Sequence, residues 1–138
     1  MSANDSIVAA ATPIGEAAIA VVRVSGSLCQ ELCKDALRVP YPTPRRSILA
    51  RYLDINESLI DDVIFVFYEA KKSYTGEPSL EISSHGNPLI SKKIIEDLVV
   101  RGCRLAEPGE YTKRAFLSGR IDLTQAESVA TLIKASSD

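Results

Sequence analysis

Two apolar runs near the N-terminus have the pattern of short buried strands. The runs cover Ser6 to Ala11 and Ala18 to Val24, and both Pro13 and Gly15 lie between them. Runs of this length, divided by a proline and a glycine, favour two strands over one continuous helix. We therefore predict that the chain begins with two strands.

Four further segments have strand character. Ser47 to Leu53 and Asp62 to Tyr68 follow a proline-rich connector, and the second is rich in β-branched and aromatic residues. Leu80 to Ser83 alternates apolar and polar residues, as a half-buried strand does. Cys103 to Leu105 completes the predicted set as a short strand.

Capping signals indicate where the first helices begin. Ser27 followed by Gln30 has the spacing of a capping box, which opens a predicted helix over Leu28 to Leu37. Asn87 caps a second helix, Pro88 to about Arg101, because proline is well tolerated at the first helical position.

Two more helices are predicted near the C-terminus. Glu110 to Leu117 forms the first, and Thr124 with Glu127 is a capping box that opens the last one. The last helix runs through Ile133 and reaches Asp138 without a glycine or proline to end it. We therefore expect the chain to be part of a longer protein.

The mixture of elements predicts the fold class. Strands and helices alternate without a regular βαβ repeat, which favours an α+β fold with a mixed sheet and flanking helices. The 138 residues suffice for one domain, or for one domain with a fragment of another. No apolar run is long enough to cross a membrane, and the sequence has no secretory signal.

Charge narrows the classes of partner. The net charge of −2 argues against a generic nucleic-acid clamp, which needs a strongly basic surface. Between Arg101 and Arg120, however, five basic residues stand against two acidic ones. This local excess suits a small anionic ligand or one part of an RNA footprint, and a solvated helix face explains it equally well.

The cysteines favour a reducing compartment. Cys29, Cys33 and Cys103 form no CxxC pair and are odd in number, which predicts reduced thiols in a cytoplasmic protein. Cys29 and Cys33 are spaced as neighbours on a helix face beside leucines, so we interpret them as small buried residues. The single histidine, His85, cannot complete a zinc site with them at any standard spacing.

Arg23 is an unusual residue within an apolar strand. Ile19, Val21 and Arg23 point to one side of that strand, and both sides are otherwise apolar. A guanidinium in such surroundings needs a carboxylate or an anionic ligand, because an unpaired buried charge is costly. The other interpretation is that Arg23 lies at the end of the strand and reaches solvent.

Glu81 occupies the polar phase of its strand, between Leu80 and Ile82, and so faces away from their core. A carboxylate on a strand is rigid and can accept two parallel N–H bonds from a flat heterocycle such as a pterin or guanine. An exposed strand glutamate without a ligand has the same spacing.

Arg120 follows Gly119 in a loop, from which its side chain could meet a ligand carboxylate or phosphate, or only solvent. The loop Ser73 to Pro78 has the polar and glycine content of a ligand lid. His85 precedes the N-terminus of the Asn87-capped helix, where backbone N–H groups are open to an anion, but the sequence assigns it no titratable partner.

Absent motifs limit the chemistry. The sequence has no GxxxxGK[ST] phosphate loop, no GxGxxG after a strand, no nucleophile elbow and no HExxH. These residues therefore indicate binding rather than turnover, and they offer GTP no usual site.

Several stretches in the same order resemble one family, the tRNA-modification GTPases called MnmE or TrmE. They are Asn4 to Ala9 with Ala11 to Gly15, Val22 to Gly26, Ser73 to Glu77 with Leu80-Glu81 and His85-Gly86, Arg104 to Leu117, and Asp122 to Glu127. The similarity is colinear over nearly the whole chain.

This resemblance implies a fold, a ligand and a dimer. The family's first domain resembles the tetrahydrofolate-binding domains of aminomethyltransferase-type enzymes, and it pairs with a second copy to form folate pockets at the interface. The family's folate contacts fall on Arg23, Glu81 and Arg120. The expected cofactor is a tetrahydrofolate derivative, either 5-formyl- or 5,10-methylene-tetrahydrofolate, with Glu81 reading the pterin edge and the arginines its polar or anionic groups.

The resemblance also implies the wider system. Residues 1–120 would form the folate-binding and dimerisation domain, and 121–138 the first helix of a central helical domain. With the flavoprotein MnmG (GidA), the family adds a carboxymethylaminomethyl-type group at C5 of the tRNA wobble uridine, using a folate one-carbon unit. GTP, magnesium and potassium would belong to a GTPase domain beyond Asp138.

Two positions depart from the family pattern. Arg120 stands where relatives often have lysine, which keeps the charge but changes the donor geometry. Ile14-Gly15-Glu16 stands where they commonly have Pro-Gly-Arg, so a cation is lost. These departures motivate a second hypothesis, a dimerisation scaffold without ligand affinity. A freestanding one-carbon transferase is disfavoured because no acid–base pair is visible.

Overall fold

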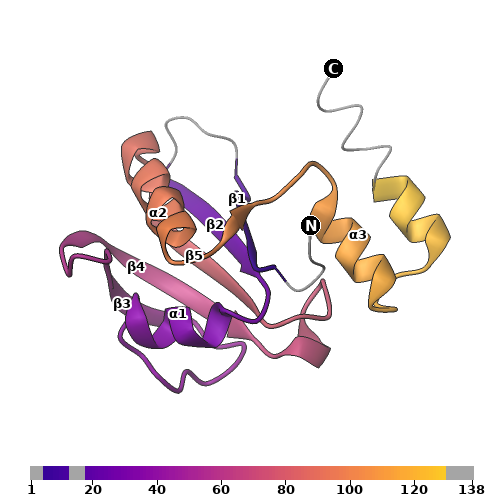
Figure 1. Cartoon of the computed structure of the whole chain (residues 1–138), viewed down its shortest axis with the longest axis horizontal. Helices are drawn as coiled ribbons and strands as arrows, with labels where there is room; N and C mark the ends of the chain where they lie inside the picture. Colours follow the sequence, from indigo (N-terminus) through magenta and orange to yellow (C-terminus); the bar gives the residue numbers. More distant parts are fainter. Residues whose placement is uncertain (1–4, 13–17, 130–138) are drawn as a thin grey trace.

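A computed structural model describes residues 5–12 and 18–129 and has one six-stranded sheet in the order β3-β4-β5-β2-β1-β6 (Figure 1). Neighbouring strands are antiparallel except β1 and β6, which are parallel. The strands are β1 (Ile7–Ala10), β2 (Ile19–Ser25), β3 (Ile48–Leu53), β4 (Leu59–Tyr68), β5 (Ser79–His85) and β6 (Arg104–Leu105). The helices are α1 (Cys29–Asp35), the 3-10 turn η1 (Ala70–Lys72), α2 (Pro88–Val100) and α3 (Glu110–Leu117), and residues 123–129 are also helical.

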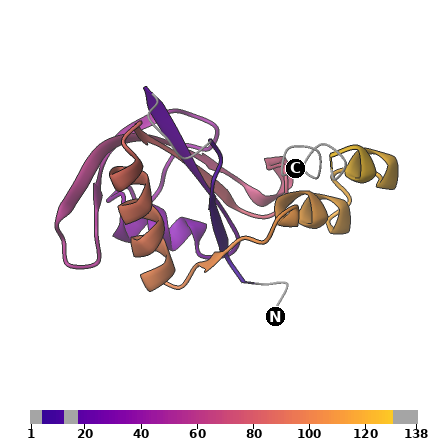
Figure 2. The ribbon, with the colours of Figure 1, turned by 90° about the horizontal axis from the view of Figure 1, so that it is seen from above.

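The core lies between one face of the sheet and helices α1 and α2, which both pack on that face (Figures 1 and 2). Alternate residues of each central strand point into it, as the two-residue period of a strand requires. The fully buried strand residues include Val22, Val24, Phe65, Leu80 and Ile82. The predicted α+β class, with a mixed sheet and flanking helices, is confirmed.

The opposite face of the sheet is left uncovered within the part of the chain that the structure describes. Ile19 and Ile64 are exposed there, and Val21 and Arg23 are half-buried. This outer side of β2 is apolar apart from Arg23, as predicted, but the expectation that it is buried is wrong. Helices α1 and α2 cover the same face, so apolar residues on the outer side have no covering layer in the described part of the chain.

The helix ends agree with the sequence in one case and differ in two. The Asn87 side chain accepts from the Leu89 N–H at 2.8 Å, so the predicted cap of α2 is confirmed. Helix α1 instead has Leu28 as its cap residue, and no side chain caps it. The Leu28 N–H donates to the Ser6 hydroxyl at 2.9 Å. A residue distant in sequence thus replaces the predicted box of Ser27 and Gln30.

The last helix begins earlier than its predicted capping box. The Asp122 N–H donates to Gln125 Oε1 at 2.9 Å, and the Gln125 N–H donates to Asp122 Oδ1 at 2.7 Å. This is the reciprocal pattern of a capping box, two residues before Thr124. The predicted passage through Ile133 lies outside the described residues, as does the segment Ile14-Gly15-Glu16.

Other expectations of the fold are met. The six predicted strands are present, although β4 begins at Leu59 and not at Asp62. Cys29, Cys33 and Cys103 are free and buried, as small core residues are. None of the helices in the described ranges is both long and apolar enough to cross a membrane.

Candidate functional site

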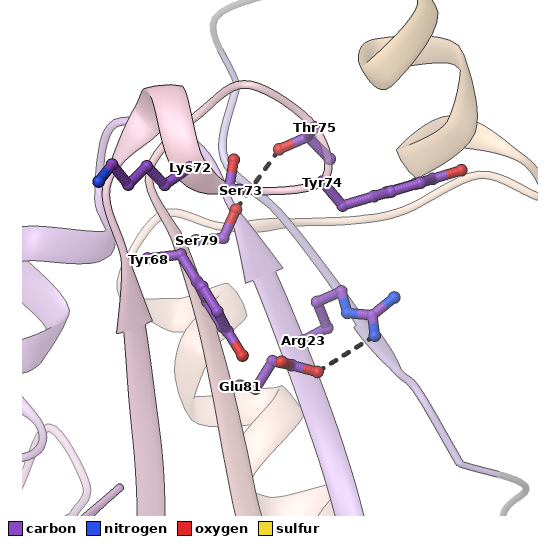
Figure 3. Close-up of a pocket in the computed structure, with 8 residues that line it drawn as sticks. All are labelled: Arg23, Tyr68, Lys72, Ser73, Tyr74, Thr75, Ser79 and Glu81. Carbon is purple, nitrogen blue, oxygen red and sulfur yellow. Dashed lines mark hydrogen bonds and ion pairs between the residues drawn. The ribbon is translucent and has the colours of Figure 1, made fainter. Parts of the chain in front are cut away.

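A cavity of about 340 Å³ opens at the end of the sheet where β2, β4 and β5 meet the loop that follows η1 (Figure 3). Strand residues form its floor and the loop forms one wall. Its lining residues are Arg23, Tyr68, Lys72, Ser73, Tyr74, Thr75, Ser79 and Glu81. This volume is within the usual range for a small-molecule site.

Arg23 and Glu81 form an ion pair in the floor of this cavity. The antiparallel pairing of β2 and β5 places them directly opposite each other, and Arg23 Nη2 lies 3.1 Å from Glu81 Oε2. Their side chains are 39% and 30% exposed, so both remain reachable from solvent. Glu81 faces away from the Leu80 and Ile82 core, as the alternation predicts.

Two tyrosines that sequence reasoning missed complete the surroundings of this pair. The Tyr111 hydroxyl donates to the Arg23 carbonyl at 2.7 Å, and the Arg23 guanidinium carbon lies 5.8 Å from the centre of the Tyr111 ring. Burial raises the pKa of the Tyr111 phenol. Burial and the neighbouring Glu81 carboxylate also raise the pKa of the Tyr68 phenol, so both hydroxyls stay protonated donors at neutral pH.

The loop Ser73 to Pro78, predicted as a ligand lid, forms a wall of the cavity and is attached to α3. The Ser118 hydroxyl donates to the Thr75 carbonyl at 2.7 Å, and the Tyr74 hydroxyl lies 3.1 Å from Thr112 Oγ1. Ser73 and Thr75 are themselves buried. Helix α3 therefore sets the position of this wall.

A buried charge network fastens the same loop to α3. Arg114 is only 8% exposed, and its Nη1 donates to Glu77 Oε1 at 2.9 Å and to the Asp5 carbonyl at 2.6 Å. Its Nη2 lies 3.2 Å from Glu110 Oε2, and Glu110 also binds Arg104 at 2.7 Å. The hydrogen bond from Arg104 is the main cause that lowers the pKa of Glu110 from 4.5 to about 2, against its burial.

These pairs account for the basic excess between Arg101 and Arg120. Three of its five basic residues, Arg101, Arg104 and Arg114, form ion pairs within the domain. Only Lys113 and Arg120 are left outside those pairs. The excess therefore serves mostly to join α3, β6 and the loop, and it is not a continuous basic surface.

Arg120 is separate from the pair of Arg23 and Glu81. Its Nη1 donates to the Lys71 carbonyl at 2.9 Å, and its side chain packs beside Gly76. It is not among the residues that line the cavity. The structure thus brings two of the three predicted site residues together. The third, Arg120, bonds instead to the turn η1, whose residue Lys72 lines the cavity.

His85 has a titratable partner that the sequence did not assign. Its Nδ1 lies 3.0 Å from Asp61, and its backbone N–H donates to Asp61 Oδ2 at 3.0 Å. Burial would raise the pKa of Asp61, but the two hydrogen bonds from His85 lower it overall. The predicted strand began at Asp62, so the sequence could not predict that Asp61 would lie beside His85.

Comparison of the chain with known proteins identifies a family. The family described as "GTP-binding protein TrmE N-terminus" matches residues 6–120. Proteins named "tRNA modification GTPase MnmE" are similar over nearly the whole chain. Those of Opitutus terrae, Nitrosospira multiformis and Thermotoga maritima are 48%, 47% and 45% identical over 135, 140 and 134 residues, which are 98%, 100% and 97% of the chain.

The chain spans about 30% of the length of these relatives. The family match extends from before β1 to Arg120, so it includes the cavity, the loop and α3. The chain therefore belongs to the family of N-terminal domains of the GTP-binding protein TrmE.

Proposed function

We propose that the cavity between β2, β5 and the loop Ser73 to Pro78 binds a reduced folate. The observation that carries this proposal is the Glu81 carboxylate, which lies in the floor of a cavity of about 340 Å³ with 30% of its side chain exposed. A carboxylate at such a point selects a flat ligand edge that carries two or more N–H donors, as a pterin does.

The acceptor capacity of Glu81 supports this assignment. Two carboxylate oxygens offer about four lone pairs, and the Arg23 guanidinium uses one of them at Oε2. Acceptor sites therefore remain for a ligand while the ion pair persists. Arg23 in turn holds the carboxylate in one orientation.

The side walls suit an aromatic ligand. Tyr68 and Tyr74 project from opposite sides of the cavity in Figure 3, and both belong to its lining. Aromatic rings at such positions contribute about 0.5–1.5 kcal/mol per stacked or edge-on contact beyond the area they bury. Ser79 and Thr75 line the loop side, where their buried hydroxyls bond to other groups of the protein and so stiffen this wall.

For the whole protein we propose a role in tRNA modification, which is supported by the names of the relatives. In this proposal the domain forms a homodimer and supplies a folate one-carbon unit. The protein acts with the flavoprotein MnmG (GidA) to place a carboxymethylaminomethyl-type group at C5 of the wobble uridine. GTP, magnesium and potassium are bound outside these 138 residues, so this chain alone does not hydrolyse GTP.

Titration calorimetry with 5-formyltetrahydrofolate tests the folate proposal. Glu81→Gln removes the charge while keeping the shape, and we expect the Kd to rise about 30-fold, as loss of about 2 kcal/mol of charge-assisted hydrogen bonding implies. Glu31→Gln is the matched control, because Glu31 is exposed on α1 at the opposite face of the sheet. Equal binding by the wild type and Glu81→Gln would show that Glu81 does not read the ligand.

A second candidate function is a dimerisation scaffold that binds no folate. It is favoured by one observation, that Arg120 bonds to the Lys71 carbonyl and does not line the cavity. Sedimentation and calorimetry on the same sample separate the two functions. A stable dimer that gives no heat with any reduced folate would leave only the scaffold.

A further inference from the structure

The outer rim of the cavity is cationic. Lys72 lines the cavity at the end away from Glu81, and its ammonium points outward in Figure 3. Lys71 precedes it on η1, and the Lys71 carbonyl accepts from Arg120 Nη1 at 2.9 Å. Three positive side chains, Lys71, Lys72 and Arg120, therefore belong to one short turn and the segment packed on it. We call these three residues the cationic rim.

The members of the cationic rim lie near two acidic residues in sequence, because Glu69 is two positions from Lys71 and Asp122 is two positions from Arg120. None of the three has an ion-pair partner within residues 5–12 and 18–129. The two acidic residues of the cavity and its wall are already engaged, Glu81 by Arg23 and Glu77 by Arg114. An exposed cluster of like charges without ion-pair partners attracts an anion, because its positive charges outnumber the nearby carboxylates.

The two ends of the cavity thus have opposite preferences. The Glu81 end requires hydrogen-bond donors, and the rim end favours negative charge. We propose that the cationic rim binds the γ-linked polyglutamate extension of a reduced folate, so that the site prefers polyglutamylated over monoglutamylated ligand. This inference rests on the folate proposal above, since it assigns the far end of the same ligand.

The physical reason is that each added glutamate brings one more carboxylate to the rim. An exposed pair of opposite charges contributes about 0.2–1 kcal/mol, so two or three such contacts amount to roughly a tenfold gain in affinity. Because these groups are exposed, the gain should shrink as salt is added. The contacts at Glu81 join its carboxylate to uncharged N–H donors of the ligand, so they should depend less on salt.

Calorimetry on the 138-residue chain compares mono- and pentaglutamyl 5-formyltetrahydrofolate. We expect the pentaglutamyl form to bind the wild type about tenfold more tightly. In the double variant Lys71→Gln/Lys72→Gln this ratio should fall to about twofold or less. Lys34→Gln is the control, because Lys34 is exposed on α1 at the opposite face, and it should keep the wild-type ratio. Circular dichroism verifies that each variant is folded.

The outcomes separate this inference from the folate proposal. Equal affinity of the wild type for the two ligands overturns the inference and leaves the folate site standing. A ratio that falls as much in Lys34→Gln also overturns it, because net charge would then be the cause. If the rim variant lowers affinity for tRNA while the ligand ratio stays near one, the rim contacts RNA phosphates instead. No binding of either ligand overturns the folate proposal itself.

Discussion

Arg114 is the residue through which α3 holds the wall of the cavity, so its replacement tests the architecture directly. Arg114→Met keeps a long apolar stem and removes the guanidinium. The change deletes hydrogen bonds to the Asp5 carbonyl, to Glu77 and to Glu110. Glu110 retains its two bonds to Arg104. Glu77 retains only the Ser25 hydroxyl among its side-chain donors in the described ranges.

The magnitude follows from burial. Removing one partner of a buried ion pair costs about 3–5 kcal/mol, because the remaining charge is left without compensation. Glu110 is still paired, and the Glu77 side chain is 24% exposed and can recover some hydration. Arg114→Met should therefore lower the free energy of unfolding by about 3 kcal/mol, near the lower end of that range.

Urea unfolding followed by circular dichroism measures this loss. Lys113→Met is the matched control, since Lys113 is the preceding residue on α3 and is exposed, and its cost should stay within about 0.5 kcal/mol. Combining Arg114→Met with Glu77→Gln should cost less than the sum of the single changes, because the stranded carboxylate is neutralised. A cost for Arg114→Met as small as that for Lys113→Met would refute the reasoning.

The remaining predictions concern acid stability and one close backbone approach. The folded-state pKa of Glu110 is lowered from 4.5 to about 2. Its contribution of about 3 kcal/mol to the free energy of unfolding is therefore present above pH 4.5 and disappears as the pH falls toward 2. Urea unfolding across this window should show that the free energy of unfolding depends less on pH in Glu110→Gln than in the wild type. Gly26→Ala should cost about 3 kcal/mol or more, because φ is +138° and an added Cβ would overlap Ser6. Gly119 has φ +80°, and an added Cβ would have no atom within 4 Å, so Gly119→Ala should cost only about 1 kcal/mol in the same urea assay.

The local elements of this protein were predictable because their signals lie within a few residues of one another. The alternation around Glu81 predicted which side chains enter the core, and Asn87 before Pro88 predicted the start of α2. The capping boxes at Ser27 and Thr124 were wrong because an i, i+3 spacing recurs by chance. The actual partners were Ser6 for α1 and Asp122 with Gln125 for the last helix.

The candidate site could be only partly predicted. Arg23 and Glu81 were singled out as charges on otherwise apolar strands, but their pairing across 58 residues depends on the register of β2 and β5. Tyr111 lies within the stretch Arg104 to Leu117 that resembles the family, but nothing in the sequence linked it to Arg23, which it contacts. Its role arises because α3 lies beside the end of β2.

By itself, then, the sequence determined the elements, the polar or apolar phase of each strand, and the family to which the chain belongs. The tertiary structure decided which charges meet. It paired Arg23 with Glu81, used Arg114 to hold the loop, and left Arg120 with Lys71 at the rim. The physical reason is that strand and helix periodicity is a property of neighbouring residues, whereas a charge takes its role from partners that only folding brings within a few ångströms.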